Sequence, residues 1–170
     1  MKIDREIIRQ TSPFEKVLHT VPGFKGYYSP HLRLDSENAF REYLTGTLNS
    51  LKNIFAKLSK TLNKNTPSEI FDEYDTIAQI MDKMAHNISN AYENYAVFFE
   101  TYSISDEHLQ EIYFFEVSII ETGENVSSMS NDLFENSPPL KELKKVTTAV
   151  RKFSKLFRQR KKILNGVKAQ

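Results

Sequence analysis

An unbroken apolar repeat over residues 70–102 decides the fold class of this chain. Its steps alternate between four and three residues, which is the heptad spacing of a long helix that packs against other helices. A half-buried strand would instead have apolar residues at every second position. The repeat therefore predicts one continuous helix whose buried face consists of Ile70, Tyr74, Ile77, Met81, Met84, Ile88, Ala91, Tyr95, Phe98 and Tyr102.

Three more segments have apolar residues at helical spacing, over residues 40–62, 109–133 and 143–164. Because the connections between the segments are only a few residues long, consecutive helices should be antiparallel neighbours. The sequence thus predicts an all-α fold, an antiparallel up-down four-helix bundle with an N-terminal helical appendage and loop. The expected division of this single domain is 1–34 for the short helix and capping loop, 35–165 for the bundle and 166–170 for a frayed tail.

Residues that commonly begin helices precede these segments. Residues 35–36 offer an Asp and a Ser as caps, Ser105 is followed by two acids, and Ser137 stands before a proline. Residues 12–15 and 66–69 both have the pattern of a capping box with an early proline. They predict the start of a short N-terminal helix and the start of the helix with the heptad repeat.

The chain contains no cysteine, which excludes disulfides, thiolate catalysis and cysteine-bound zinc. Its first ten residues are charged and lack the apolar run of a signal peptide, and no segment approaches the ~18 apolar residues of a membrane span. We therefore expect a cytoplasmic protein, with a location peripheral to a membrane as the alternative. No catalytic or phosphate-loop motif is present, and we expect no enzyme activity, no metal and no cofactor.

Charge is distributed in three blocks, although the whole chain has a net charge of only +1. Residues 1–65 hold 11 Lys or Arg against 6 Asp or Glu, residues 66–136 hold 1 against 15, and residues 137–170 hold 11 against 1. Two interpretations stay open: acidic helices pack beside basic ones, or the basic end binds phosphate or an anionic membrane. The second interpretation gives a candidate anion-binding set of Lys155, Arg158, Arg160, Lys161 and Lys162.

A loop over residues 21–34, VPGFKGYYSPHLRL, precedes the first long helix. In the predicted bundle it lies at the end where the first and third long helices begin and the second and fourth end. Gly23 and Gly26 permit sharp turns, so the aromatic residues of the loop can fold over this end. The loop then either caps the core or covers a site for a ligand or partner. The candidate partner-binding residues are Phe24, Lys25, Tyr27, Tyr28, His31 and Arg33.

Two residues interrupt the apolar face of the segment 109–133. Glu116 and Gly123 fall where leucine or isoleucine is expected, and a turn near residue 104 would set them opposite Tyr92 and Met84. A buried carboxylate needs a hydrogen-bond or charge partner, or it must take up a proton. We expect a buried polar network that fixes helix register, with catalysis as the alternative, formed by Arg41, Tyr92, Tyr95, Glu100 and Glu116.

The stretch VPGFKGYYSPHLRLDSENAFREYL resembles a signature of a family of uncharacterised bacterial all-helical proteins, in which a Pro-Gly-x-x-Gly-Tyr turn precedes a helix start with Arg and Asp. The stretch YENYAVFFETYSISDEHLQEIYFFEVSII resembles the second block of that family, an aromatic helix that ends in Phe and an acid. The resemblance covers residues 13–130, with Glu where the family pattern has Asp and Asn94 where it has Gly. It implies that the loop and the two acids form one unit, and it implies no activity. The signature positions are Arg33, Asp35, Arg41, Glu100 and Glu116.

These observations give two hypotheses of function. The first is a non-enzymatic interaction or scaffold protein that binds an unidentified protein partner through the bundle end under loop 22–34. The second is binding of an anionic ligand, namely a membrane headgroup, a nucleotide or a nucleic acid, by the basic C-terminal helix. Phe153 and Phe157 of that helix match its core face, which argues against their insertion into a membrane. The heptad seam can also pair with a second copy of the chain, so a homodimer is a further alternative.

Overall fold

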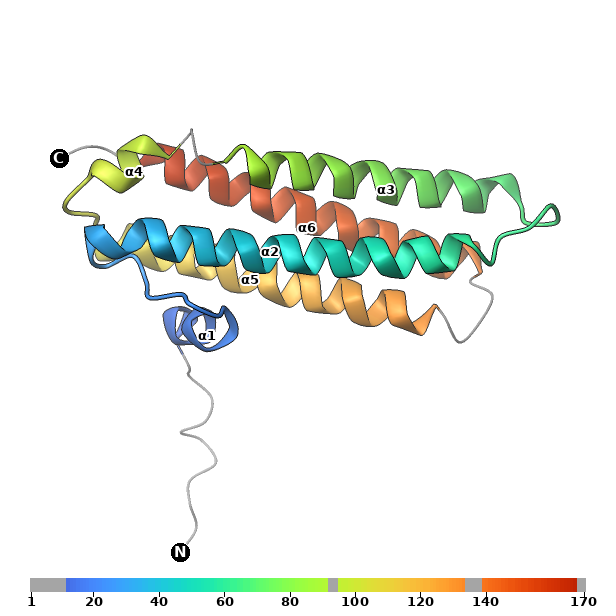
Figure 1. Ribbon diagram of the computed structural model, residues 1–170, viewed down its shortest axis with the longest axis horizontal. Helices are drawn as coiled ribbons and strands as arrows, with labels where there is room; N and C mark the ends of the chain where they lie inside the picture. Colours follow the sequence, from blue (N-terminus) through green and yellow to red (C-terminus); the bar gives the residue numbers. More distant parts are fainter. Residues whose placement is uncertain (1–11, 92–94, 134–138, 168–170) are drawn as a thin grey trace, which may run out of the picture.

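The computed structural model describes residues 12–91, 95–133 and 139–167. Within these residues every regular element is a helix, which confirms the all-α prediction. Four long helices lie side by side along the length of the molecule, with two short helices toward one end (Figure 1). None of the described helices has both the length and the apolar content that crossing a membrane requires. The helices are α1 (Pro13–Thr20), α2 (Pro30–Ser59), α3 (Ser68–Ser89), α4 (Ala96–Glu100), α5 (Asp106–Asp132) and α6 (Leu140–Gly166).

Each long helix packs mainly against two others, since both α2 and α6 contact α3 and α5. The helices α3 and α5 therefore lie diagonally, although they are consecutive long helices in the sequence. The short helix α4 lies between them in the chain and occupies one end of the molecule (Figure 1). The expectation that consecutive helices are neighbours does not hold for this pair, because α4 lengthens the connection. As a result α2 and α5 are parallel neighbours, and so are α3 and α6 (Figure 1).

The predicted continuous helix over residues 70–102 is in fact interrupted. The helix α3 ends at Ser89, Asn90 caps it, and α4 begins at Ala96. Serine and asparagine side chains compete for backbone hydrogen bonds and favour helix ends. Tyr95 and Phe98 are still buried, so the apolar spacing continues across the break and hides it. Tyr102, which the repeat assigns to the buried face, is 89% exposed.

The first long helix begins earlier than predicted, at Pro30 rather than at residues 35–36. Ser29 is the N-cap, and Pro30 occupies the first helical position, where the missing N–H leaves no hydrogen bond unmade. The loop that remains turns at Gly23 and Gly26, whose φ angles are 79° and 92°. These positive angles explain why the loop carries glycine at both positions.

The predicted helix starts are correct at two positions. Ser12 and Glu15 form the expected capping box of α1, and the side chain of Ser105 caps α5. The prediction is wrong at α3, because Pro67 is its N-cap and no side chain caps the first turn. Ser137, the predicted cap before the last helix, lies outside the described residues.

Gly123 permits a close approach between helices, but not with the predicted partner. A Cβ atom at this position would lie 3.3 Å from Cγ2 of Thr47 on α2 and 3.4 Å from Cζ of Phe153 on α6. The expected neighbour, Met84, belongs to the diagonally opposed helix α3. Glycine here allows α5 to pack closely against both of its neighbours.

The predicted frayed tail over residues 166–170 is wrong for its first two residues. Gly166 is the last residue of α6, and Val167 is buried with 6% of its surface exposed. Val167 thus belongs to the hydrophobic core just beyond the helix end. Residues 168–170 lie outside the described residues.

Candidate functional site

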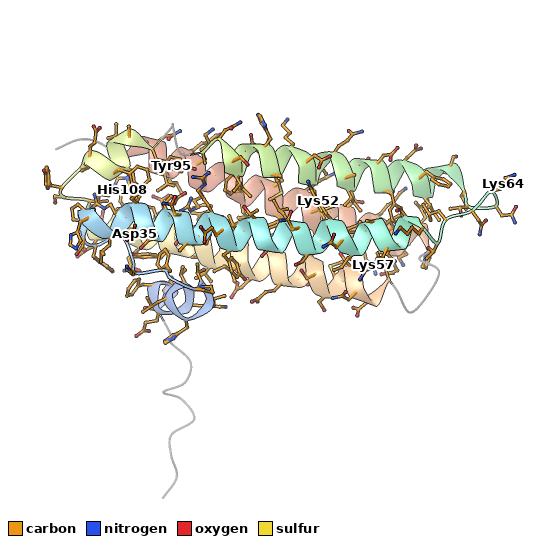
Figure 2. All side chains as sticks on the ribbon, in the orientation of Figure 1. Asp35, Lys52, Lys57, Lys64, Tyr95 and His108 are labelled. Carbon is orange, nitrogen blue, oxygen red and sulfur yellow. The ribbon has the colours of Figure 1, made fainter. Side chains whose placement is uncertain are left out.

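Four polar side chains from four parts of the sequence meet in the interior of the molecule. They are fully buried, and we call them the buried charge cluster: Tyr27 from the loop, Glu37 from α2, Glu116 from α5 and Arg160 from α6. The cluster lies toward the end where α2 and α5 begin and α6 ends. In Figure 2 this end is marked by three labels: Asp35 near the start of α2, His108 near the start of α5 and Tyr95 just before α4.

The guanidinium of Arg160 is shared between two carboxylates. Its Nη1 and Nη2 donate to the two carboxylate oxygens of Glu37 at 3.3 and 2.6 Å, and its Nε and Nη2 donate to Oε1 of Glu116 at 3.1 and 2.6 Å. The Tyr27 hydroxyl donates to the same Oε1 at 2.6 Å and accepts from Nη2 at 3.0 Å. The ring of Phe40, 4.6 Å from Cζ of Arg160, adds a cation–π contact. Arg160 is thus fixed by partners from three other segments.

One cation faces two carboxylates in this cluster, so full ionisation would leave a negative charge without solvent. Burial raises the pKa of Glu116 to about 7, although the charge of Arg160 and the hydrogen bonds from Tyr27 and Arg160 act in the opposite direction. Oε2 of Glu116 is buried and has no hydrogen-bond partner among the described residues, whereas both oxygens of Glu37 accept from Arg160. A proton taken up by the cluster is therefore most stable on Glu116.

Arg160 and Tyr27 keep their ordinary protonation states within the cluster. Burial by itself would lower the pKa of Arg160, but the charges of Glu37 and Glu116 and its polar contact with Tyr27 raise it well above its usual value. Burial, helped by the charge of Glu116, raises the pKa of Tyr27 well above its usual value. The guanidinium is thus charged and the phenol neutral at physiological pH, and the pKa of Glu116 lies near neutrality.

A second buried guanidinium, that of Arg33, is held by backbone carbonyls. It is 1% exposed and donates to the carbonyl oxygens of Tyr27 at 2.8 Å, of Phe98 at 3.1 Å, and of Thr101. Burial lowers its pKa from the usual value. Because these carbonyls belong to the loop and to the segment of α4 and its C-cap, Arg33 fastens both segments to the first turn of α2.

The loop closes over the buried charge cluster by aromatic packing. The ring of Tyr27 stacks on that of Tyr113 at a centroid distance of 5.6 Å, and the rings of Phe24 and Phe98 meet it edge-on at 5.1 and 5.3 Å. The backbone N–H of Tyr27 also donates to the Tyr113 hydroxyl at 2.8 Å. The loop therefore caps the end of the core, which was the first of its two interpretations.

The six predicted partner-binding residues fall into two groups. Phe24, Tyr27 and Arg33 are buried, because they attach the loop to the core. The prediction that they offer a binding surface is therefore wrong. The three others lie at least partly at the surface: Lys25, Tyr28 and His31.

The predicted polar network also differs from the observed one. Arg41 donates to the carbonyl oxygens of Ile88 and Ser89, each at 3.0 Å, and so caps the end of α3. Glu100 is exposed at the last position of α4. Of the remaining members, Glu116 and Tyr95 are buried, and Tyr92 lies outside the described residues. The hydroxyl of Tyr95 has no hydrogen-bond partner within the described part of the chain, and burial raises its pKa to about 12.

Sequence reasoning missed Glu37 as a partner of Glu116, and it gave Arg160 the wrong role. Both residues continue the apolar spacing of their helices: Glu37 precedes Phe40 by three positions, and Arg160 follows Phe157 by three. Glu116 interrupts an apolar face in the same way. The sequence therefore contained a signal for this cluster, because two acids and one base occupy core positions of three helices.

A groove between α3 and α6 collects basic side chains. It has a volume of about 370 Å³, and four cations line it: Lys83 from α3, and Arg151, Lys155 and Arg158 from α6. Its other lining residues are Ile80, Asn87 and Ser154, so no carboxylate lines it. We call this the basic groove.

The four cations of the basic groove have no acidic partner among the described residues. Asp82, which directly precedes Lys83 in the sequence, is instead paired with Lys52 of α2 at 2.6 Å. The acidic helices α3 and α5 both pack against α6, but no ion pair among the described residues involves these four cations. Acidic helices thus lie beside the basic one, as the first interpretation has it, while the four cations of this groove stay without an ion pair in the described part of the chain.

The predicted anion-binding set is only partly exposed. Lys155 and Arg158 line the basic groove, Lys162 is exposed and Lys161 is half-buried. Arg160 is fully buried in the charge cluster, so its assignment to an anion-binding surface is wrong. Sequence reasoning missed the other polar lining residues, although Arg151 precedes Lys155 and Arg158 by one and two helical turns.

Another groove, of about 670 Å³, lies between α2 and α5. Glu42 and Glu124 line it together with small residues and Tyr43, and its surface is mostly apolar. Burial raises the pKa of Tyr43. Among the described residues, no group of three or more His, Asp or Glu side chains is arranged to hold a metal ion. Of the grooves described, the basic groove has the more specific chemistry.

The resemblance to bacterial all-helical proteins that rests on residues 13–130 stays a prediction. Three of its signature residues, Arg33, Arg41 and Glu116, make buried or half-buried polar contacts between segments, while Asp35 and Glu100 are exposed. Their positions assign them no common site. Comparison of the chain with family models, with curated proteins and with solved structures gives no match.

Proposed function

We propose that this protein is a non-enzymatic scaffold that binds an anionic ligand through the basic groove. The observation that supports the proposal is the set of four cations on two helices that have no acidic partner within the described residues. A concave site lined by charge of one sign raises the local concentration of ligands of the opposite charge. In this proposal the four long helices act as one bundle that presents α3 and α6 side by side.

The buried charge cluster supports a structural role rather than catalysis. Glu37, Glu116 and Arg160 are fully buried, so a substrate has no access to their carboxylate or guanidinium groups. A buried ion pair of this kind fixes the register of the segments that supply it. We assign the cluster to holding α2, α5 and α6 in place, and ligand binding to the exposed groove.

Retention on a sulfated polysaccharide resin tests the proposal, because such a resin offers anionic groups without a specific ligand. The double variant Arg151→Gln/Lys155→Gln removes two charges from the groove. The control Lys141→Gln/Lys144→Gln removes two exposed charges from the same helix outside it. We expect the groove variant to elute at clearly lower salt than the control. Equal elution of the two variants would contradict the proposal.

A protein partner at the loop end is the second candidate function, and exposed aromatic side chains favour it. Tyr28 is 48% exposed and Phe114 is 59% exposed. Nε2 of Gln110, one turn before Phe114 on α5, donates to the Tyr28 hydroxyl at 3.3 Å. A purification with Tyr28→Ala/Phe114→Ala, compared with Phe71→Ala as an exposed aromatic control, tests this candidate. It is excluded if both variants retain the same partners as the unmodified chain.

A further inference from the structure

We propose that the basic groove takes the phosphate chain of a small, multiply phosphorylated ligand, with an inorganic triphosphate as the simplest example. This inference rests on the proposed anion binding and names the class of ligand. Its evidence is the neutral donors that line the groove, the spacing of the cations and the absence of aromatic residues from the lining among the described residues.

Two neutral lining residues of the groove supply hydrogen-bond donors. The side chains of Asn87 and Ser154 are half-buried there, and neither has a hydrogen-bond partner among the described residues. An amide N–H₂ and a hydroxyl both donate to phosphate oxygens. The groove thus combines exposed charged side chains with half-buried neutral donors, and no lining residue repels an anion.

The cations on α6 follow one helical face. Arg151, Lys155 and Arg158 are four and then three residues apart, which corresponds to steps of roughly 6 and 4.5 Å along a helix axis. Lys83 approaches from α3 on the other side. Guanidinium groups match phosphate oxygens in pairs, while lysine acts as a point charge. A short chain of linked phosphates suits this row better than a single phosphate, because it can contact several cations at once.

The groove lacks the contacts that nucleic acids and membranes use. No aromatic residue lines it, whereas proteins that bind single strands stack bases on aromatic rings. No exposed large hydrophobic side chain occurs on the described part of α6, and Phe71 is the one such residue on α3. A helix that lies on a membrane inserts residues of this kind. Small phosphorylated ligands require neither contact.

Calorimetric titration of the full chain with sodium triphosphate at low salt tests the inference. Parallel titrations use orthophosphate, a short single-stranded oligonucleotide of mixed sequence, and vesicles with anionic lipid. We expect triphosphate to bind at one site and orthophosphate to bind at least about tenfold more weakly, since it contacts fewer cations. Arg151→Gln/Lys155→Gln should weaken triphosphate binding about tenfold or more, and Lys141→Gln/Lys144→Gln should change it less than about twofold.

A second variant separates this inference from the proposed function. Asn87→Ala/Ser154→Ala removes the two neutral donors, so it should weaken triphosphate binding several-fold. Because the variant keeps every charge, its retention on the sulfated resin should be unchanged. Tighter binding of the oligonucleotide or the vesicles than of triphosphate, lost in the groove variant, would overturn the inference and leave the proposed function intact. Absence of binding by all four titrants, together with unchanged resin retention of the groove variant, would overturn both. Circular dichroism of each variant shows whether it is folded.

Discussion

Nη2 of Arg160 lies 2.6 Å from Oε1 of Glu116, and neither side chain has any exposed surface. The same nitrogen lies 2.6 Å from Oε2 of Glu37, so one guanidinium bridges α2, α5 and α6. Removing charges from water offsets much of the attraction between them, and a buried pair therefore contributes more to register than to net stability. Loss of one partner, by contrast, strongly destabilises the fold, because the remaining charges stay buried without compensation.

Replacement of Arg160 by methionine should strongly destabilise the fold. Arg160→Met leaves Glu37 and Glu116 buried without a cation, and breaking a buried pair from one side costs roughly 3–5 kcal/mol. Urea denaturation followed by circular dichroism measures the change in the free energy of unfolding. The control Arg158→Met alters an exposed residue two positions earlier on α6 and should change it by less than about 0.5 kcal/mol. Equal effects of the two substitutions would contradict the role assigned to Arg160.

The free energy of unfolding should fall as the pH rises through neutrality. The pKa of Glu116 is about 7 in the folded protein against 4.5 for an ordinary glutamate, so between these values the folded state binds a proton that the unfolded state does not. The stabilisation is complete below about pH 4.5 and is lost as the pH passes 7, with a total change on the order of 3 kcal/mol. Urea denaturation at a series of pH values measures this slope.

Two variants identify the group responsible for the pH dependence. Glu116→Gln removes the titrating carboxyl and should flatten the slope between pH 5 and 8. Glu111→Gln changes an exposed glutamate on the same helix and should leave the slope as it is. A slope that persists unchanged in Glu116→Gln would assign the effect to another residue.

The hydroxyl of Tyr27 should contribute measurably to stability. Tyr27→Phe removes the donor to Glu116 at 2.6 Å and the acceptor for Arg160 at 3.0 Å, and hydrogen bonds to charged groups are worth about 1.5–3 kcal/mol. Tyr28→Phe is the matched control, since the hydroxyl of this half-exposed residue accepts from Gln110 at the surface. Thermal unfolding compares the two. Similar melting temperatures for both variants would show that the Tyr27 hydroxyl is dispensable.

Alanine at two glycines should have opposite effects. Gly26 has a φ of 92°, and a Cβ there would lie 2.7 Å from Cε2 of Phe14, so Gly26→Ala should lower the free energy of unfolding by about 1–3 kcal/mol. Gly46 lies inside α2, where a Cβ would project into open space, and Gly46→Ala should raise the free energy of unfolding by up to about 1 kcal/mol. Chemical denaturation of both variants checks the signs. Stabilisation by Gly26→Ala would contradict the observed turn.

Periodicity predicts the long helices well, because burial of a continuous apolar face is a property that the sequence carries locally. The same periodicity conceals the end of α3, since Ala91, Tyr95 and Phe98 remain buried on both sides of the break. The diagonal arrangement of α3 and α5 follows from that break. Spacing alone does not encode which helices become neighbours, because any two apolar faces can pack together.

The candidate site is harder to predict from the sequence than the fold. The basic run around Arg160 suggests a surface position, although its spacing from Phe157 puts it on the core face. The predicted helix start at residues 35–36 placed Arg33 in a loop. In the structure α2 begins at Pro30, so Arg33 is a buried residue of its first turn. The basic groove combines residues from two helices that are far apart in the sequence, and its cations become a set only when α3 and α6 are known to be neighbours.

The long sequence separation within the charge cluster has a consequence for biosynthesis. Glu37 and Glu116 precede Arg160 by 123 and 44 positions, so both acids are synthesised before the base that neutralises them. Without Arg160, burial of Glu37 and Glu116 between the helices would require either two unneutralised carboxylates or their protonation, and both are costly. Complete packing of α2 and α5 therefore depends on α6, the helix that supplies the shared cation.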